Sequence, residues 1–135
     1  MTIDELRTFC LSLPETHEKE TWGDAEHPGD VTFRVRDKIY LITGQDGGGA
    51  TIRTDRAQQA DLLAAFPDAV TVAAYVGRFG WVSVRLDGLD PSIVRDIIVA
   101  AYRRTAPKAV VAAYDAERAA DPERVAAAVP ARPGT

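Results

Sequence analysis

The 135-residue chain is poor in the residues that build disulfides and zinc sites, with one cysteine, Cys10, and two histidines, His17 and His27. One cysteine excludes an internal disulfide, and one cysteine with two histidines cannot supply a four-ligand Cys/His zinc site. No stretch approaches the roughly 20 apolar residues that span a bilayer. The start of the chain carries Asp4 and Glu5, where a signal peptide has a basic start and an apolar run. We therefore expect a cytoplasmic protein without a membrane segment.

Catalytic and phosphate-binding motifs are equally scarce. None of the serines Ser12, Ser83 and Ser92 lies in a Gly-x-Ser-x-Gly elbow. Cys10 lies on the apolar stripe of the first predicted helix, which favours a buried, inert thiol. The glycine-rich run 44–49 continues as a strand instead of opening a helix, so it predicts a hairpin tip and not a P-loop. The sequence predicts neither an enzyme nor a cofactor site.

Charge is unevenly distributed along the chain. The total is 16 basic against 20 acidic side chains, a net charge of −4. Residues 1–30 hold two cations and eight acids (−6), whereas residues 31–86 hold seven cations and five acids (+2). A net-acidic protein is a poor general ligand for phosphate backbones, although a local basic face can bind them. Such a face would lie in the middle segment.

Hydrophobic periodicity predicts alternating helices and strands. Apolar residues three and four apart predict a helix over 2–13, with Thr2 and Glu5 as a capping box and Pro14 at its end. Residues 15–30 are acidic and punctuated by glycine and proline, which predicts a loop. Trp22, in that loop, is expected to pack against the first helix. Clean alternation predicts a strand over 31–36, and after a tight turn at Asp37 a β-rich run predicts a second over 38–43 and a short third over 50–54.

The second half of the chain continues the pattern. A helix is predicted over 55–66, an extended segment over 70–75 and a strand over 81–86. Asp90 and Pro91 start the strongest helical stripe, and a short helix over 107–114 follows. This order predicts an α+β fold, a two-layer sandwich of helices on an antiparallel sheet. Residues 1–115 form its one domain, and residues 116–135 form an Ala/Pro-rich, partly ordered tail.

Strand alternation also predicts a basic and aromatic face on the side of the sheet away from the helices. If Val31, Phe33 and Val35 face the helices, the residues between them face the open side, and neighbouring strands add to it at a spacing of two. The candidate binding residues on this face and its edges are Arg34, Arg36, Lys38, Tyr40, Arg53, Arg78, Trp81 and Arg85, with Arg56 as a further edge cation. Cations interleaved with rings can pair with phosphates and stack on bases. The alternative is a solvated or partner-facing sheet whose arginine stems cover aromatic rings for packing alone.

The acidic segment 15–30 offers a second, weaker possibility. Its carboxylates and imidazoles are metal ligands by type, but their positions match no metal motif, and adjacent acids on a surface loop are normally solvated. Its ionisable residues are His17, Glu18, Glu20, Asp24, Glu26, His27 and Asp30. We predict no metal site there and keep metal or small-molecule binding as the least favoured alternative.

Several short segments together resemble the MmcQ/YjbR family of small bacterial proteins over about residues 2–114. They are Leu13-Pro14-Glu15, Trp22-Gly23, the strand pair from Phe33 to Tyr40, the run from Tyr75 to Val82, Ala101-Tyr102-Arg103 and Ala106-Pro107-Lys108. The resemblance implies a frataxin-like (CyaY-like) sandwich. It also implies DNA binding through a double-wing arrangement of β-hairpins, and it supplies no catalytic motif, cofactor or ligand residues.

Two functional hypotheses follow from the residues and the resemblance. The first is a cytoplasmic, non-enzymatic binding module that holds nucleic acid on the basic face. The second is a protein-interaction or structural module that uses the same face for a partner chain or a second copy. Salt-dependent binding discriminates the first from the second, because neutralised phosphates release counterions.

Overall fold

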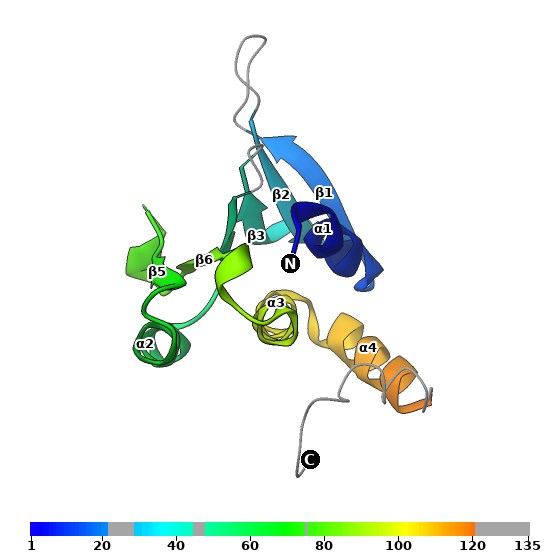
Figure 1. The fold of residues 1–135 in the computed structure, drawn as a ribbon. Helices are drawn as coiled ribbons and strands as arrows, with labels where there is room; N and C mark the ends of the chain where they lie inside the picture. The colour runs from blue at the N-terminus through cyan, green and yellow to red at the C-terminus, as the bar shows by residue number, and fades with distance from the viewer. Residues whose placement is uncertain (22–28, 45–47, 75, 121–135) are drawn as a thin grey trace.

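The computed structural model describes residues 1–21, 29–44, 48–74 and 76–120. In this part of the chain six strands form one antiparallel sheet in the order β1-β2-β3-β4-β6-β5. Helices α1 and α3 pack against one face of the sheet, and α2 lies beside β5 (Figure 1). The predicted α+β class, a two-layer sandwich with an antiparallel sheet, is confirmed.

The strands lie close to the predicted ranges, apart from one that the sequence did not indicate. Their bounds are β1 Thr16–Thr21, β2 Asp30–Val35, β3 Lys38–Thr43, β4 Gly49–Ile52, β5 Val70–Val72 and β6 Val82–Arg85. The prediction of a loop over 15–30 is wrong for Thr16–Thr21. This strand is polar along its whole length because it lies at the edge of the sheet, so no apolar alternation marks it.

The helices begin at the residues that the capping signals predict. Their bounds are α1 Ile3–Ser12, α2 Arg56–Ala65, α3 Pro91–Thr105 and α4 Lys108–Ala120, with short 3-10 turns η1 Gly77–Phe79 and η2 Leu86–Gly88. Thr2 and Glu5 form the expected capping box, and Asp55 and Asp90 cap α2 and α3. Helix α4 runs past the predicted boundary at residue 115, so 116–120 are helical and not part of a loose tail.

The core lies between the sheet and helices α1 and α3. It joins Leu6 and Cys10 of α1, Phe33 and Leu41 of the sheet, and Ile98 of α3, all at most 1% exposed. Cys10 is buried, as predicted, and burial raises the pKa of its thiol to about 12. Among the described helices, none combines the length and the apolar character needed to cross a membrane.

Candidate functional site

Most of the predicted binding residues lie at one end of the sheet. At this end β2 and β4 finish, at Val35 and Ile52, and β3 and β6 begin, at Lys38 and Val82. We call it the arginine end. Arg34 and Lys38 lie in the strands there, and Arg53, Arg78 and Trp81 lie in the adjoining connections. Alternation placed Lys38 on the open face with Arg34, which is wrong: Lys38 is in register with Val35, on the face that carries the core, because the extra residue Tyr40 follows it in β3.

Tyr40 is the clearest correction to the predicted face. Its side chain is fully buried on the helix side, where its hydroxyl lies 3.0 Å from Thr16 Oγ1 and its ring packs edge-on against Tyr102. The reason is a register shift: Phe33 pairs with Leu41 and Arg34 with Ile39, so Tyr40 is an extra residue in β3. The bulge turns Tyr40 and Leu41 to the same side, and Tyr40 offers no ring to a ligand.

The same bulge also changes which side chains lie at the centre of the open face. Ile42 lies in register with Thr51, and Thr51 with Ser83, on the face opposite the core. Ile39 and Ile42 are only half-buried there. The open face thus carries two isoleucines where Tyr40 was predicted.

Arg36 is also misplaced by the prediction. It forms the two-residue turn between β2 and β3 with Asp37, and both residues have positive φ, 50° and 68°. Its guanidinium donates to Glu15 at 2.6 Å and 3.2 Å. Because of this pairing, the Glu15 carboxyl has a pKa below its usual value, and Arg36 is committed to a carboxylate beside the turn.

Arg34 lies on the open face, as predicted. Its guanidinium donates to the hydroxyls of Thr32 (3.0 Å) and Thr21 (3.4 Å) and to the Asp37 carbonyl (3.4 Å). All three acceptors are neutral, and no carboxylate within the described ranges forms an ion pair with it. These contacts hold the Arg34 guanidinium in position but do not neutralise its charge.

Arg53 and Arg104 meet where β4 leads into α2 and α3 ends. Arg53 donates to the Thr105 hydroxyl at 3.2 Å. Arg104 donates to the Arg53 carbonyl at 3.4 Å and to the Asp55 carboxylate at 3.3 Å. The Asp55 carboxyl, which caps α2 and faces Arg104, has a pKa below its usual value. The Asp55 carboxylate is therefore the one acidic group beside Arg53 and Arg104 in the contacts described.

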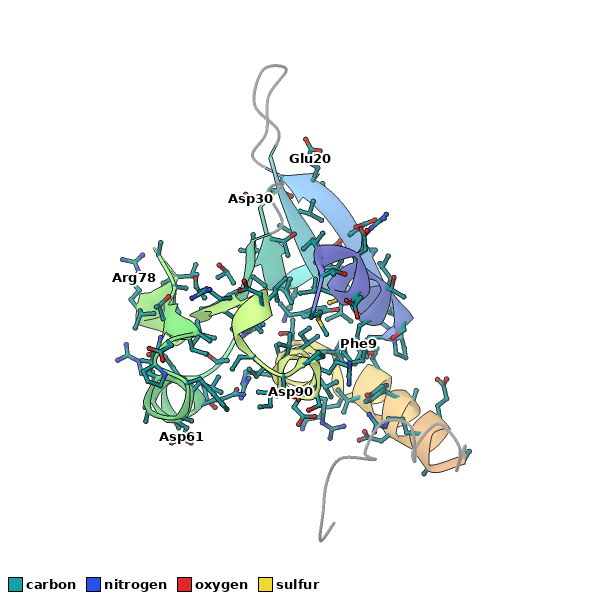
Figure 2. The ribbon with its side chains drawn as sticks, in the orientation of Figure 1. Phe9, Glu20, Asp30, Asp61, Arg78 and Asp90 are labelled. Carbon is teal, nitrogen blue, oxygen red and sulfur yellow. The ribbon has the colours of Figure 1, made fainter. Side chains whose placement is uncertain are left out.

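Arg56 and Arg78 form the adjacent part of the site. Arg56 donates to the Arg78 carbonyl at 2.9 Å, and the Arg78 guanidinium lies 4.8 Å from the centre of the Phe79 ring. Phe79 is 62% exposed, the largest exposure among the large apolar side chains described. Arg78 projects from the rim of the molecule near β5 (Figure 2). An exposed ring with a cation on it is the arrangement that the sequence argument sought.

Hydrogen bonds and a close backbone approach join the connection after β4 to the connection before β6. Thr54 donates its hydroxyl to the Gly80 carbonyl, and Gln59 Nε2 donates to the Trp81 carbonyl at 2.8 Å. Gly80 has φ 97°, and a Cβ there would lie 2.8 Å from the Asp55 carbonyl carbon. Only glycine satisfies both the dihedral angle and the close approach. Trp81 follows at once and is half-buried.

Arg85 does not belong to this region. It lies at the opposite end of β6, in register with Gly49, roughly 13 Å along the strand from Trp81. Its guanidinium forms an ion pair with Asp87 at 3.5 Å. By register Arg85 shares the open face with Ser83, as alternation predicts, but it lies at the other end of β6 from the remaining candidate residues.

The structure assembles a group that we call the arginine cluster: Arg53, Arg56, Arg78 and Arg104. Four guanidiniums and one paired carboxylate, that of Asp55, give a local charge of 4 − 1 = +3. Sequence analysis did not include Arg104 and Phe79 among the candidate residues. The signal for Phe79 was its place in a tight turn bounded by Gly77 and Gly80.

The acidic segment gives no metal centre within the described residues, which contain no group of three potential ligands. His17 and Glu18 point to opposite faces of β1, and Glu18 is bound by Arg7. Several residues about which the sequence made predictions lie outside the described residues: Trp22, Asp24, Glu26 and His27 of the acidic segment, and residues 45–47 of the glycine run.

The fold and the cluster define a class: a small two-layer α+β protein with one bare sheet face and a basic end. The sequence pattern of the YjbR family matches residues 11–104, so the chain belongs to this family. Its fold is similar to the crystal structure of the Deinococcus radiodurans protein DR2400, a DUF419 domain, with a TM-score of 0.69, 24% identity and 86% of each chain covered. Among curated proteins, none matches the chain.

Proposed function

We propose that this protein is a cytoplasmic, non-enzymatic binding module that holds single-stranded nucleic acid at the arginine end. The arginine cluster carries the proposal, because three of its four guanidiniums have only neutral partners among the described residues. Phosphate oxygens are the natural anionic acceptors for such groups. The resemblance to a family labelled DNA-binding supports the same reading.

The exposed aromatic ring favours a single strand over a duplex. Base stacking on aromatic side chains contributes about 1–3 kcal/mol per base and needs a base free of its partner. Phe79 is exposed and has the Arg78 guanidinium over its ring, and Trp81 follows two residues further on. An unpaired base on Phe79 would place its flanking phosphates beside Arg56 and Arg78.

The negative net charge limits where the strand can lie. Glu20 and Asp30 lie at the far end of the sheet, well away from Arg78 (Figure 2). Phosphates are repelled there, so we propose that binding is confined to the arginine end.

The test is fluorescence anisotropy with labelled single-stranded DNA, duplex DNA and RNA across a salt series. We expect single strands to bind with a log-log slope of about −2, since each neutralised phosphate contributes about −0.7 and three guanidiniums are available. Arg56→Glu with Arg78→Glu should weaken binding about tenfold or more. The matched control, Arg95→Glu with Lys108→Glu, makes the same charge change on exposed helical positions and should bind nearly as wild type. Equal loss in both variants, or no binding at low salt, contradicts the proposal.

A second function, docking of a protein chain on the open face, is favoured by the outward position of Ile39 and Ile42. Hydrophobic centres with polar rims are typical of interfaces. Size-exclusion chromatography should then give a mass well above 14.6 kDa, and Ile42→Asp should restore the monomer. A strict monomer argues against a second copy on this face. Tyr40→Ala is unsuitable as a test because it removes a buried ring.

A further inference from the structure

A row of side chains crosses the open face of the sheet at the arginine end. By register His17 lies opposite Arg34, and Arg34 lies opposite Ile39. Trp81 directly precedes the buried residue Val82 of β6, so strand alternation places it on the open face as well. We call these four residues the transverse row: His17, Arg34, Ile39 and Trp81.

The burial pattern agrees with this placement. Ile39 and Trp81 are half-buried. Neither is among the partly buried apolar side chains that pack against the core, a group that includes Val31 and Phe66. Two apolar side chains therefore lie on the open face with one side toward solvent, where they can support the flat face of a nucleic-acid base.

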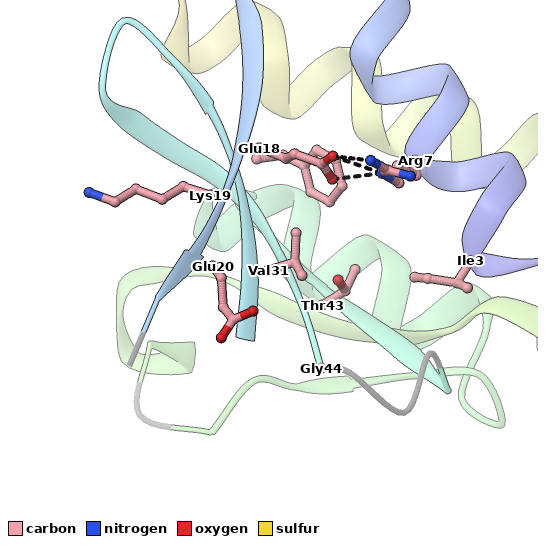
Figure 3. Close-up of a pocket in the computed structure, with 9 residues that line it drawn as sticks. Ile3, Arg7, Glu18, Lys19, Glu20, Val31, Thr43 and Gly44 are labelled. Atoms are coloured by element: carbon pink, nitrogen blue, oxygen red, sulfur yellow. Dashed lines mark hydrogen bonds and ion pairs between the residues drawn. The ribbon is translucent and has the colours of Figure 1, made fainter. Parts of the chain in front are cut away.

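Strand β1 turns two side chains to the open face beside Arg34. Figure 3 shows the Glu18 carboxylate turned toward Arg7 of α1 and the Lys19 side chain extending from the opposite side of the strand. His17 and Lys19, which flank Glu18 in the sequence, are both exposed. A lysine and an imidazole thus border Arg34 at this margin of the sheet.

Arg34 keeps donors available for an anion. A guanidinium has five N–H donors, and the contacts of Arg34 with two threonine hydroxyls and the Asp37 carbonyl use three of them, two at 3.4 Å. The carboxylates beside the turn face other groups: Glu15 accepts from Arg36, and Asp37 Oδ1 lies 3.9 Å from His17 Nε2. Arg34 can therefore donate its remaining N–H groups to a phosphate oxygen.

The length of the transverse row sets the length of a ligand that covers it. Strands β6 and β2 are three spacings apart, since β4 and β3 lie between them, so Trp81 and Arg34 are separated by roughly 14 Å. A strand of about four nucleotides, extended across the row, can place a base on Trp81 and a phosphate at Arg34. Phe79, two residues before Trp81, lies at the end of this path nearest the arginine cluster.

We propose that a single strand held at the arginine cluster continues along the transverse row, with bases on Trp81 and Ile39 and a phosphate at Arg34. The ligand is then an extended oligonucleotide of about four or more nucleotides that runs perpendicular to the strands of the sheet. This inference rests on the proposed nucleic-acid function and adds to it the length and the direction of the ligand.

The test compares fluorescein-labelled oligothymidylates of two and eight nucleotides by anisotropy with the full chain. The matched variants are Arg34→Gln and Lys38→Gln, which each remove one positive charge from neighbouring strands at the same end of the sheet. Lys38 lies on the face that carries the core, so its replacement leaves the transverse row intact. The longer ligand also gains affinity because it offers more binding registers, but this gain is the same in wild type and in both variants.

The effect of Arg34→Gln should depend on ligand length. It should weaken the octanucleotide about five- to tenfold, since one charged hydrogen bond to phosphate is lost. The salt slope for the octanucleotide should become shallower by about 0.7. The dinucleotide, which fills only the arginine cluster, should bind Arg34→Gln as wild type, and this result also shows that the variant is folded. Lys38→Gln should bind both ligands as wild type.

Trp81 gives an independent signal, because Trp22 is the only other tryptophan in the sequence. In a Trp22→Phe background, stacking of a base on Trp81 should quench the remaining tryptophan fluorescence. At saturation the octanucleotide should quench this fluorescence more strongly than the dinucleotide does. Equal quenching by the two ligands would contradict a strand that extends along the row.

Two further results would overturn this inference and leave the proposed function in place. One is full affinity of Arg34→Gln for the octanucleotide, and the other is an equal loss for both ligands, which would show that Arg34 acts through the fold. In either case, loss of binding in the variant Arg56→Glu with Arg78→Glu would still support the arginine cluster. Absence of binding by every oligonucleotide would overturn the proposed function and this inference together.

Discussion

Phe79 is a large apolar side chain that lies mostly outside the core. It is 62% exposed and bears the Arg78 guanidinium on its ring. A large apolar side chain this open contributes little to stability, so its replacement can test binding separately from folding.

We therefore predict that Phe79→Ala lowers affinity for single-stranded nucleic acid by about 1–3 kcal/mol, the value of one stacked base. Stability should change by less than about 0.5 kcal/mol because the residue is on the surface. Anisotropy and urea unfolding measure the two effects separately. Leu11→Ala, at a 40% exposed position on α1, is the control that should leave affinity unchanged. Unchanged binding in Phe79→Ala would exclude the ring from the interface.

At single positions, sequence reasoning succeeded where alternation held and failed where one residue was inserted. Arg34 was placed on the open face correctly because Phe33 and Val35 alternate around it. Tyr40 was placed wrongly because alternation cannot show a bulge, which depends on pairing with another strand. The positive φ of Arg36 was missed because the turn was assigned to Asp37 alone.

The connections 53–56 and 77–81 act as one unit, with Gly80 at their contact. A Cβ at position 80 would lie 2.8 Å from the Asp55 carbonyl carbon and 2.9 Å from the Arg56 amide, in a backbone with φ 97°. The two segments that carry most of the arginine cluster would have to separate.

We predict that Gly80→Ala lowers the free energy of unfolding by about 1–3 kcal/mol, since both strain and a clash arise. The folded fraction should also lose affinity for single-stranded DNA, because Arg56 and Arg78 move apart. Thermal unfolding and anisotropy below the transition report the two effects. A variant of full stability and full affinity would contradict the account of this contact.

Elements were predicted best where their signals are local. Caps at Thr2 and Asp90 fixed two helix starts, and Asp55 caps the third helix, since each side chain bonds to nearby backbone amides. Strand β1 was missed because it is extended only through its pairing with β2. In that pairing Lys19 lies opposite Thr32 and Glu18 opposite Phe33. An edge strand without an apolar stripe carries no periodic signal.

Across the whole molecule, acidic groups support the fold through caps and ion pairs. The pKa values of Glu5, Glu15, Glu18, Asp55 and Asp90 all lie below their ordinary values. The main causes are hydrogen bonds from Thr2, Arg36, Arg7, the Gln58 amide and Ser92 respectively. The folded protein thus binds protons less readily than the unfolded chain.

Because these pKa values are lowered in the folded protein, we predict that acid destabilises the fold. The contribution is fully present above the ordinary pKa values, 4.5 for glutamate and 3.8 for aspartate, and is lost as the pH falls through the lower folded-state values. We expect the urea midpoint to be nearly flat above about pH 6 and to fall below about pH 4.5. Glu18→Gln should make this fall shallower, whereas Asp61→Asn, an exposed change on α2, should leave it unaltered. A midpoint that rises toward pH 3 would contradict the assignment.

The distribution of charge along the sequence predicted a basic middle segment, and the fold concentrates part of it. Arg53, Arg56 and Arg78 come from that segment, but Arg104 comes from the balanced C-terminal part. The net charge of a sequence segment cannot reveal the arginine cluster, because residues from three separate parts of the chain form it. The order of the predicted elements supplied the fold class, and strand alternation supplied the bare face.

The outer strands of the sheet are poor templates for further growth. Strand β1 pairs only with β2 and presents His17, Glu18, Lys19 and Glu20 in succession, while β5, the other edge, is three residues long. Charged and very short edges discourage the addition of a foreign strand. Fibril-like growth of the sheet is thereby discouraged at both margins, which leaves its broad bare surface as the part of the sheet open to a partner.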